Sequence, residues 1–210
     1  MFLNKSRIKY SWFKCTSKNS FIVNKSTVIK SRIYVVGVNN KLNINNCFLE
    51  NSIITIDGIG NLVEVEAGVK LRKVNLIIRG NNCSVRIGKD TTFGGARIVN
   101  VGSDNSIVIG NNCLFADKIE IWASDTHAIY DENGNWINKE KPIIIESNVW
   151  VGSKVTILKG VKIGDGSIIG METLLTKDVK AKTIVAGNPA REIKKNVYWT
   201  LDYPLQNNKF

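Results

Sequence analysis

The chain contains a single histidine, His127, within the segment S-D-T-H-A-I-Y-D. A neutral imidazole can take the proton of a hydroxyl or amine as that group attacks an electrophile, and histidine is the side chain most often used in this way. Most lone histidines have no catalytic role, so the residue type alone does not assign one. The carboxylates of Asp125 and Asp131 lie near it in sequence, and each could either orient the imidazole or be an ordinary solvated loop residue. The candidate chemistry is therefore general base catalysis by His127.

The other groups that commonly bind metals or act as nucleophiles are four cysteines, at positions Cys15, Cys47, Cys83 and Cys113. No two of them form a C-x-x-C pair, and one histidine cannot complete a Cys/His cluster. We therefore expect no metal site, and we expect these thiols to be reduced and partly inward-facing.

Charge and composition restrict the class of protein. The 210 residues suit one domain, 43% of them are apolar, and the formal net charge is +11. Residues 1–32 contain eight lysines and arginines and no acidic residue. No nucleic-acid-binding motif accompanies this charge, so we expect a solvated basic segment with at most a weak contact to a membrane surface or polyanion. No run of 18 apolar residues and no signal-peptide core occur, which predicts no membrane-spanning segment and a cytoplasmic location.

A repeat of 21 or 22 residues is marked by glycines, at Gly37, Gly58, Gly80 and Gly102. Apolar residues stand four positions before each glycine and five and seven positions after it, with the period of two that is typical of a half-buried strand. Glycines and Asn-rich pieces between the strands tolerate the positive φ that turns require. Because the repeats are alike, the pattern predicts a solenoid in which each coil stacks in parallel on the previous one.

A tighter repeat begins at residue 145, where an aliphatic residue recurs at every sixth position: Ile145, Val151, Ile157, Ile163, Ile169 and Leu175. Three six-residue faces make one triangular coil, so residues 145–180 should form two coils with one aliphatic side chain per face inside the prism. Lys159 and Lys162 lie between two of the inward positions and should tolerate alanine, because they should point outward.

The longer repeat is interrupted after Ile121. Ala123 and Ser124 occupy the position of the next turn, but the next strand signal arrives only at Pro142. Residues 124–141 therefore form a loop extruded at one corner. In solenoids such an insertion usually carries function, because the coils supply rigidity and the loop supplies chemistry. The location of His127 in this loop makes it the candidate catalytic base.

Two segments resemble the C-terminal half of the hexapeptide-repeat acyltransferases: W-V-G-S-K-V-T-I-L-K-G-V-K-I-G-D-G-S-I-I-G-M-E-T-L-L-T-K-D-V, residues 150–179, and I-V-A-G-N-P-A-R-E-I-K, residues 184–194. With the loop, the resemblance covers roughly residues 100–195, and the SDTHAIYD, TILKGV and AGNPA pieces are most similar to bacterial capsule and polysialic acid O-acetyltransferases. It implies an all-β fold, a left-handed parallel β-helix with one extruded loop at 124–141 and a short C-terminal tail. The hand follows from the resemblance alone, because ordinary parallel crossovers are right-handed.

We accordingly expect a basic N-terminal segment over residues 1–32 that leads into the first coil, a β-helix over 33–180, and a C-terminal segment over 181–210.

The resemblance also implies a reaction: transfer of an acetyl group from acetyl-CoA, as co-substrate and without a metal, to a hydroxyl of a saccharide, such as a surface polysaccharide or its precursor. His127 aligns with the general base of the family, and the backbone N–H of Ser153 aligns with the donor to the oxyanion of the tetrahedral intermediate. Trp150 aligns with an active-site tryptophan that packs on the acceptor or the CoA arm; the alternative is an ordinary exposed ring on the coil.

For CoA, the resemblance implies a groove between coils that involves Ser153, Met171, Thr176 and Lys177, with charge from Arg191 and Lys194 for the phosphates. These two cations could equally be merely solvated. Two features depart from the family pattern. Met171-Glu172-Thr173 replaces the small Ala-Gly-Ser of most relatives, which bears on the width of the groove. Residues 91–97 contain no asparagine, which sugar acetyltransferases often place there to hold the acceptor.

In the family, three chains pack side by side and each active site lies between two of them, so a homotrimer is implied, with no nucleic-acid partner. Two alternatives stay open: an acetyltransferase for an amino sugar or small xenobiotic, and a non-catalytic β-helix used as an assembly module. The presence together of the histidine, the tryptophan and the Gly-Ser pair argues against the assembly module.

Overall fold

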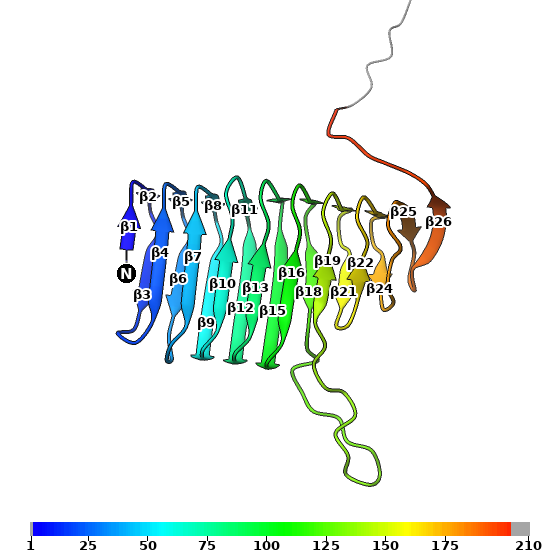
Figure 1. The fold of residues 1–210 in the computed structure, drawn as a ribbon, viewed down its shortest axis with the longest axis horizontal. Helices are drawn as coiled ribbons and strands as arrows, with labels where there is room; N and C mark the ends of the chain where they lie inside the picture. Colours follow the sequence, from blue (N-terminus) through cyan, green and yellow to red (C-terminus); the bar gives the residue numbers. More distant parts are fainter. Residues whose placement is uncertain (1, 203–210) are drawn as a thin grey trace, which may run out of the picture.

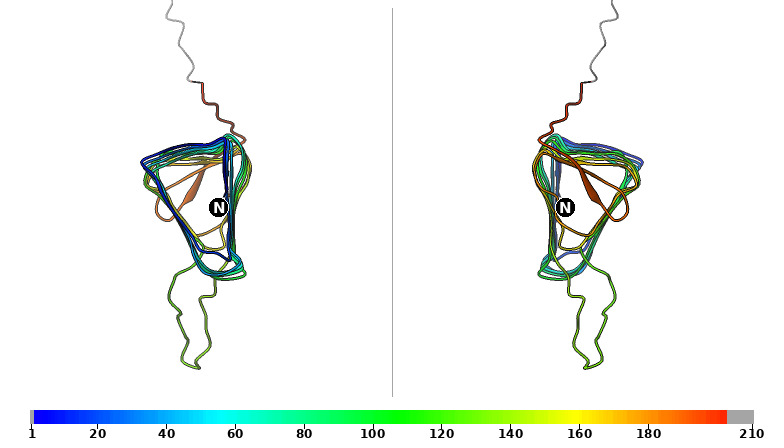
Figure 2. Two further views of the ribbon diagram at one scale, coloured as in Figure 1. Left: turned by 90° about the vertical axis from the view of Figure 1, so that its left-hand side faces the viewer. Right: turned by 90° about the vertical axis from the view of Figure 1, so that its right-hand side faces the viewer.

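Three sheets form the walls of a triangular prism. The computed structural model describes residues 2–202, and in that stretch every regular element is a strand (Figure 1). Consecutive strands belong in turn to sheets A, B and C, so three strands make one coil, and the end views show the triangular cross-section (Figure 2).

The strands of each sheet follow one another along the prism in chain order. Sheet A contains β1 (Phe2–Asn4), β4 (Ser20–Asn24), β7 (Lys41–Asn45), β10 (Leu62–Val65), β13 (Ser84–Ile87), β16 (Ser106–Ile109), β19 (Ile143–Ile145) and β22 (Lys162–Ile163). Sheet B contains β2 (Arg7–Lys9), β5 (Thr27–Ile29), β8 (Phe48–Glu50), β11 (Lys70–Arg72), β14 (Thr92–Phe93), β17 (Leu114–Phe115), β20 (Trp150–Val151), β23 (Ile168–Ile169), β25 (Thr183–Ala186) and β26 (Arg191–Lys195). Sheet C contains β3 (Trp12–Cys15), β6 (Arg32–Val35), β9 (Ile53–Ile59), β12 (Val74–Asn81), β15 (Ala96–Ser103), β18 (Ile119–Trp122), β21 (Thr156–Leu158) and β24 (Leu174–Leu175).

The register of the strands confirms both repeats. Val63 pairs with Val85, which is 22 residues further along the chain, and Ile145 pairs with Ile163, which is 18 residues further. All these pairings are parallel; the exception is β26, which runs antiparallel to β25. The coils of the N-terminal part are therefore wider than the hexapeptide coils, and the difference lies mainly in sheet C, where eight-residue strands give way to strands of two to four residues.

The solenoid begins earlier than residue 33. Strands β1 to β6 already form coils between Phe2 and Val35, and Phe2 pairs with Ile22 on the next coil. The glycine marker is absent from the first coil because residues 16–19, which contain no glycine, make the turn at the corresponding corner, where Asn19 Nδ2 donates to the Gly37 carbonyl at 3.1 Å. At the other two corners Lys5, Lys25 and Lys30 adopt a positive φ. The basic N-terminal segment is thus part of the β-helix, with its cations placed partly at the corners and partly on the strands.

The core is a stack of inward side chains, one layer for each coil. Ile157 and Ile163 are completely buried, as the six-residue period predicts. In the wider coils, the rings of Phe93 and Phe115 stack with their centroids 4.3 Å apart. All four cysteines are free thiols, and Cys15 is the one among them that is not buried.

The corner where sheet C passes into sheet A, here called the loop corner, is built from glycine and asparagine ladders. Gly58, Gly80 and Gly102 lie one above another, and a Cβ on Gly58 or Gly80 would overlap the carbonyl oxygen of the next glycine. Beside them the buried side chain of Asn61 donates to Asn40 Oδ1 at 2.9 Å and to the Gly80 carbonyl at 2.8 Å. These bonds satisfy backbone groups that the tight turns leave unpaired.

The loop corner is also where the chain leaves the prism. Residues 124–141 extend away from the coils between β18 and β19, as both figures show. Strand β15 pairs with β18 only over residues 96–99, so within the described chain no strand stacks on residues 100–103. The side chain of Glu140, from the end of the loop, covers Gly102 there.

The C-terminal segment completes and closes the prism. β25 pairs in parallel with β23, and β26 then turns back across the open end. Residues 196–202 run along the outside, and residues 203–210 lie outside the described range. Within residues 2–202 the structure contains no helix long and apolar enough to cross a membrane.

Candidate active site

His127 lies on the exposed part of the extruded loop. The loop is held in shape by local bonds: Tyr130 and Trp136 form an antiparallel bridge, and Asp131 Oδ1 accepts hydrogen bonds from the backbone N–H groups of Asn133 and Asn135. The Asn135 side chain, which also donates to this carboxylate, and then the two backbone N–H groups hold the pKa of the Asp131 carboxyl below its usual range. Asp131 is therefore used to close the turn at the loop tip.

Asp125, like Asp131, binds groups other than the His127 ring. Its Oδ2 atom lies 2.5 Å from Lys159 Nζ and 2.8 Å from Asn138 Nδ2. These two donors, Lys159 first, lower the pKa of the Asp125 carboxyl against the opposing effect of partial desolvation. Neither of the two carboxylates considered as partners of His127 makes a hydrogen bond to its ring within residues 2–202. Lys159 is not the solvated side chain expected from the repeat, whereas Lys162 is largely exposed.

Trp150 and Ser153 lie at a different corner, where sheet B passes into sheet C, here called the serine corner. Trp150 is on β20 with 40% of its surface exposed, and its ring lies 6.0 Å from that of Trp199 in the C-terminal tail. Ser153 Oγ donates to Asp117 Oδ1 at 2.5 Å, which lowers the pKa of the Asp117 carboxyl. Trp150 is therefore a half-exposed ring with a contact to the tail, beside the corner.

The backbone at the serine corner is open to a ligand. Within the described residues, no protein acceptor is hydrogen-bonded to the N–H of Ser153. Gly152 lies against the next coil, where a Cβ would stand 2.8 Å from the nitrogen of Met171. Met171 itself is 61% exposed. A free backbone N–H beside a glycine is what an oxyanion donor requires.

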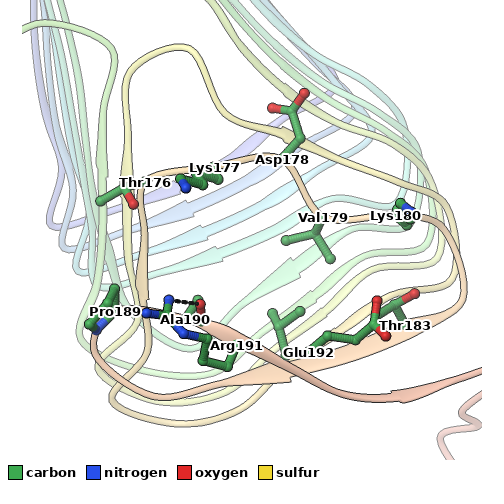
Figure 3. Close-up of a pocket in the computed structure, with 11 residues that line it drawn as sticks. Thr176, Lys177, Asp178, Val179, Lys180, Thr183, Pro189, Ala190, Arg191 and Glu192 are labelled. Atoms are coloured by element: carbon green, nitrogen blue, oxygen red, sulfur yellow. Dashed lines mark hydrogen bonds between the residues drawn. The ribbon is translucent and has the colours of Figure 1, made fainter.

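A pocket of about 600 Å³ lies at the C-terminal end of the prism (Figure 3). Thr176, Lys177 and Arg191 line it together with Asp178 and Glu192. Three of the residues expected to contact CoA are thus brought together, whereas Lys194 is outside the lining. Figure 3 shows the Arg191 side chain turned toward the carbonyl of Ala190, to which Nη1 donates at 3.0 Å.

Within one chain the two halves of the expected site are apart. His127 leaves from the loop corner, between sheets C and A, and Ser153 is at the serine corner, between sheets B and C. The two corners are separated by the whole width of sheet C. Sequence reasoning placed these residues together only through the family resemblance. It missed Asp117 and Lys159, whose roles depend on contacts between adjacent coils, with partners 36 and 34 positions away in sequence, and Asn138, whose role depends on how the loop folds back on itself.

Residues 142–177 match the family described as Bacterial transferase hexapeptide (six repeats). The polysialic acid O-acetyltransferase of Neisseria meningitidis is 35% identical over 147 residues, which cover 59% of this chain and 68% of the relative. The chain belongs to the hexapeptide-repeat acetyltransferases. The polysialic acid O-acetyltransferase of Escherichia coli O1:K1 / APEC is 38% identical over 124 residues, but this match spans only 40% of that longer protein.

Two solved structures are similar to this protein over its whole length, beyond the hexapeptide repeats. The crystal structure of the polySia specific acetyltransferase NeuO has a TM-score of 0.75 at 32% identity and covers 100% of this chain and 92% of that one. The polysialic acid O-acetyltransferase OatWY has a TM-score of 0.73 at 29% identity, with 99% and 95% covered. The expected left-handed β-helix is thereby confirmed, and the match includes the basic N-terminal coils, which the sequence resemblance did not reach.

Proposed function

We propose that this hexapeptide-repeat acetyltransferase moves an acetyl group from acetyl-CoA to a hydroxyl of polysialic acid or of a similar anionic saccharide. The observation that carries the proposal is the whole-chain likeness to two polysialic acid acetyltransferases, combined with a single histidine on the loop that leaves the prism. The use of acetyl-CoA would place the reaction in the cytoplasm.

The charge distribution supports an anionic acceptor. Lys30, Lys73 and Lys118 lie on alternate coils at the serine corner, and each is exposed and has a positive φ. Lys73 and Lys118 line a pocket of about 360 Å³ with Arg97. The carboxylates of Asp117, which accepts from Ser153, and Glu120 also line it, so cations exceed acidic side chains there by three to two. A row of like charges raises the local concentration of a polyanion. Together with a net charge of +11, this row favours a carboxylate-bearing polymer over a neutral sugar.

His127 acts as the general base in the proposed reaction. Its neutral imidazole takes the proton of the acceptor hydroxyl while the hydroxyl oxygen attacks the thioester carbonyl carbon. The oxyanion of the tetrahedral intermediate accepts a hydrogen bond from the N–H of Ser153. Collapse of the intermediate breaks the carbon–sulfur bond, and the imidazolium returns its proton to the CoA thiolate. The products are an acetyl ester and CoA.

The separation of the two corners supports a site shared between chains. In a homotrimer, the loop with His127 from one chain would meet the serine corner of its neighbour. The exposed apolar side chains Ile129, Tyr130 and Ile137 on the loop would then be covered by that neighbour. Trp150 would pack on the acceptor or on the CoA arm. The pocket lined by Thr176, Lys177 and Arg191 would hold part of the CoA, and Met171 and Lys194 would contact other parts of it.

The test is an assay of the purified chain with acetyl-CoA and polysialic acid. Thiol release together with base-labile acetyl groups on the polymer is the expected result. A neutral polysaccharide and an amino sugar serve as competing acceptors. Base-stable acetyl groups on the amino sugar would instead support an N-acetyltransferase. The absence of thiol release with every acceptor would contradict the proposal and favour an assembly module.

A further inference from the structure

The base of the loop is tied to the prism by one lysine from a later coil. Lys159 follows β21 at the loop corner, and its Nζ lies 2.5 Å from Asp125 Oδ2 and 2.6 Å from the carbonyl oxygen of Asn138. These two acceptors stand at opposite ends of the loop. Only 17% of the Lys159 side chain is exposed, although it is a charged residue on the outside of a solenoid. A lysine buried to this degree needs acceptors for its charge, and the loop supplies them.

Asn138 joins the outgoing and the returning segments of the loop. Its Nδ2 donates to Asp125 Oδ2 and to the carbonyl oxygen of His127, each at 2.8 Å. Its Oδ1 accepts from the backbone N–H of Ile129 at 2.7 Å and from Trp136 Nε1 at 2.8 Å. One amide therefore contacts Asp125, two residues before the histidine, Ile129, two residues after it, and the backbone carbonyl of the histidine itself. All four of its hydrogen-bonding positions are used.

We propose that Lys159, Asp125 and Asn138 form a loop anchor that positions His127 for proton transfer. The inference rests on the proposed function, in which His127 is the base. The three residues are positioning residues: none contacts the ring of His127, and their bonds end at its backbone carbonyl. The anchor sets the direction in which the loop leaves the prism, and so the place that the imidazole can reach.

The rest of the loop has few other ties to the coils. Lys141 N donates to the Ala123 carbonyl at 3.4 Å, and the Glu140 side chain covers Gly102. Nearly all side chains from Asp125 to Ile137 are exposed. Without the anchor, the loop would sample many conformations, and an error of about 1 Å in the position of a catalytic group can lower the rate ~100-fold. The anchor is therefore expected to act on turnover rather than on folding.

The decisive variant is Lys159→Met, which keeps the length of the side chain and removes its charge. Lys162→Met is the matched control, because Lys162 lies only three residues further along the chain, at the start of β22, and pairs with Glu146 at 2.8 Å on the exposed surface. We expect Lys159→Met to lower kcat by ~10–100-fold, with unchanged CoA affinity and melting temperature. Lys159→Arg should recover part of the lost rate, since it restores a donor to Asp125. Lys162→Met should behave like the wild type.

A direct readout is available because the chain has one histidine. In protein labelled with ¹⁵N-histidine, the ring signals of His127 should broaden or shift in Lys159→Met and in Asn138→Ala, and trypsin should cut faster at Lys139. Asp125→Asn gives the same test if Lys159→Met does not fold. Unaltered kcat, ring signals and cleavage in the folded variants would overturn the anchor. If the wild type transfers no acetyl group, the proposed function fails, and the ring signals and cleavage alone decide the anchor.

Discussion

Gly80 lies directly beneath Gly102 of the next coil, so close that a methyl group on its Cα would overlap the Gly102 carbonyl oxygen. The φ of Gly80 is +146°, a conformation that side chains with a Cβ rarely adopt. Gly80→Ala should therefore lower the melting temperature strongly, with a loss of at least ~2 kcal/mol. Gly134→Ala is the control, because Gly134 at the loop tip also has a positive φ but has no atom within 4 Å of the added Cβ. Equal melting of the two variants would show that stacking does not require the ladder.

The six-residue period makes a second prediction about stability. Ile157 is completely buried, so Ile157→Asp would place an unpaired carboxylate in the prism and should prevent folding. Lys162→Ala should change the free energy of unfolding by no more than ~0.5–1 kcal/mol, because it removes only an exposed ion pair. Urea denaturation followed by circular dichroism compares them. Equal sensitivity at both positions would contradict the inward and outward assignment.

The third prediction concerns catalysis. His127→Ala should reduce turnover by ~10²–10⁴-fold, the usual effect of removing a general base, while CoA still binds. Glu132→Ala, also exposed on the loop, is the control and should retain the wild-type rate. Steady-state rates of thiol release and calorimetric titration with CoA give the two quantities. A His127→Ala variant with nearly normal turnover would exclude it as the base.

Asp125 makes a prediction about pH. The pKa of its carboxyl is lowered by Lys159, so the folded loop binds the proton less readily than a free loop does. The contribution of the ion pair is then fully present above the ordinary aspartate value of about 3.9 and is lost as pH falls through the lower value in the fold. In the His127→Ala variant, whose loop contains no imidazole, we expect the backbone amide signals of the loop to stay unchanged from pH 8 to pH 5 and to move only below about 4. Movement near pH 6 would show that another group controls the loop.

The thiols differ in their expected reactivity. Burial raises the pKa of Cys47 to about 12 and that of Cys113 to about 11, and it also raises the pKa of Cys83. These thiols should resist a disulfide reagent at neutral pH because the thiolate is the reactive form. Cys15, which is only half-buried, should react first. Mass spectrometry after brief labelling should find one modified cysteine in the native protein and four after unfolding.

The repeats were predictable from sequence because their physical cause is local. Inward residues such as Ile157 recur with the period of the coil, and the loop was visible as a break in that period after Ile121. The N-terminal coils were missed because residues 16–19, at the corner that later glycines mark, contain no glycine, and because lysines such as Lys25 adopt the positive φ at the other corners. Long polar side chains at tight corners carry no turn signal of their own.

The candidate site was predictable only in part. His127 is conspicuous as the single histidine, and family resemblance supplied Ser153. The Lys159–Asp125 contact joins residues 34 positions apart and depends on which lysine of the coil lies beneath the loop. Lys159 and Lys162 are alike in sequence, and only the path of the loop across one of them distinguishes their roles.

The narrowing of the solenoid explains where the loop starts. The wide coil that contains β15 is followed by a narrower one, so residues 100–103 form a ledge on the loop corner. If all coils had the same circumference, a loop inserted between two strands would break hydrogen bonds between neighbouring coils. At residues 100–103 no strand of the next coil, in the part of the chain that the structure describes, forms those hydrogen bonds, so a loop can start there without breaking them. A longer loop also adds little closure entropy, ~0.6 kcal/mol for each doubling of its length. The change of circumference thus provides one place at which segments of different length and chemistry can be exchanged without disturbing the stack below.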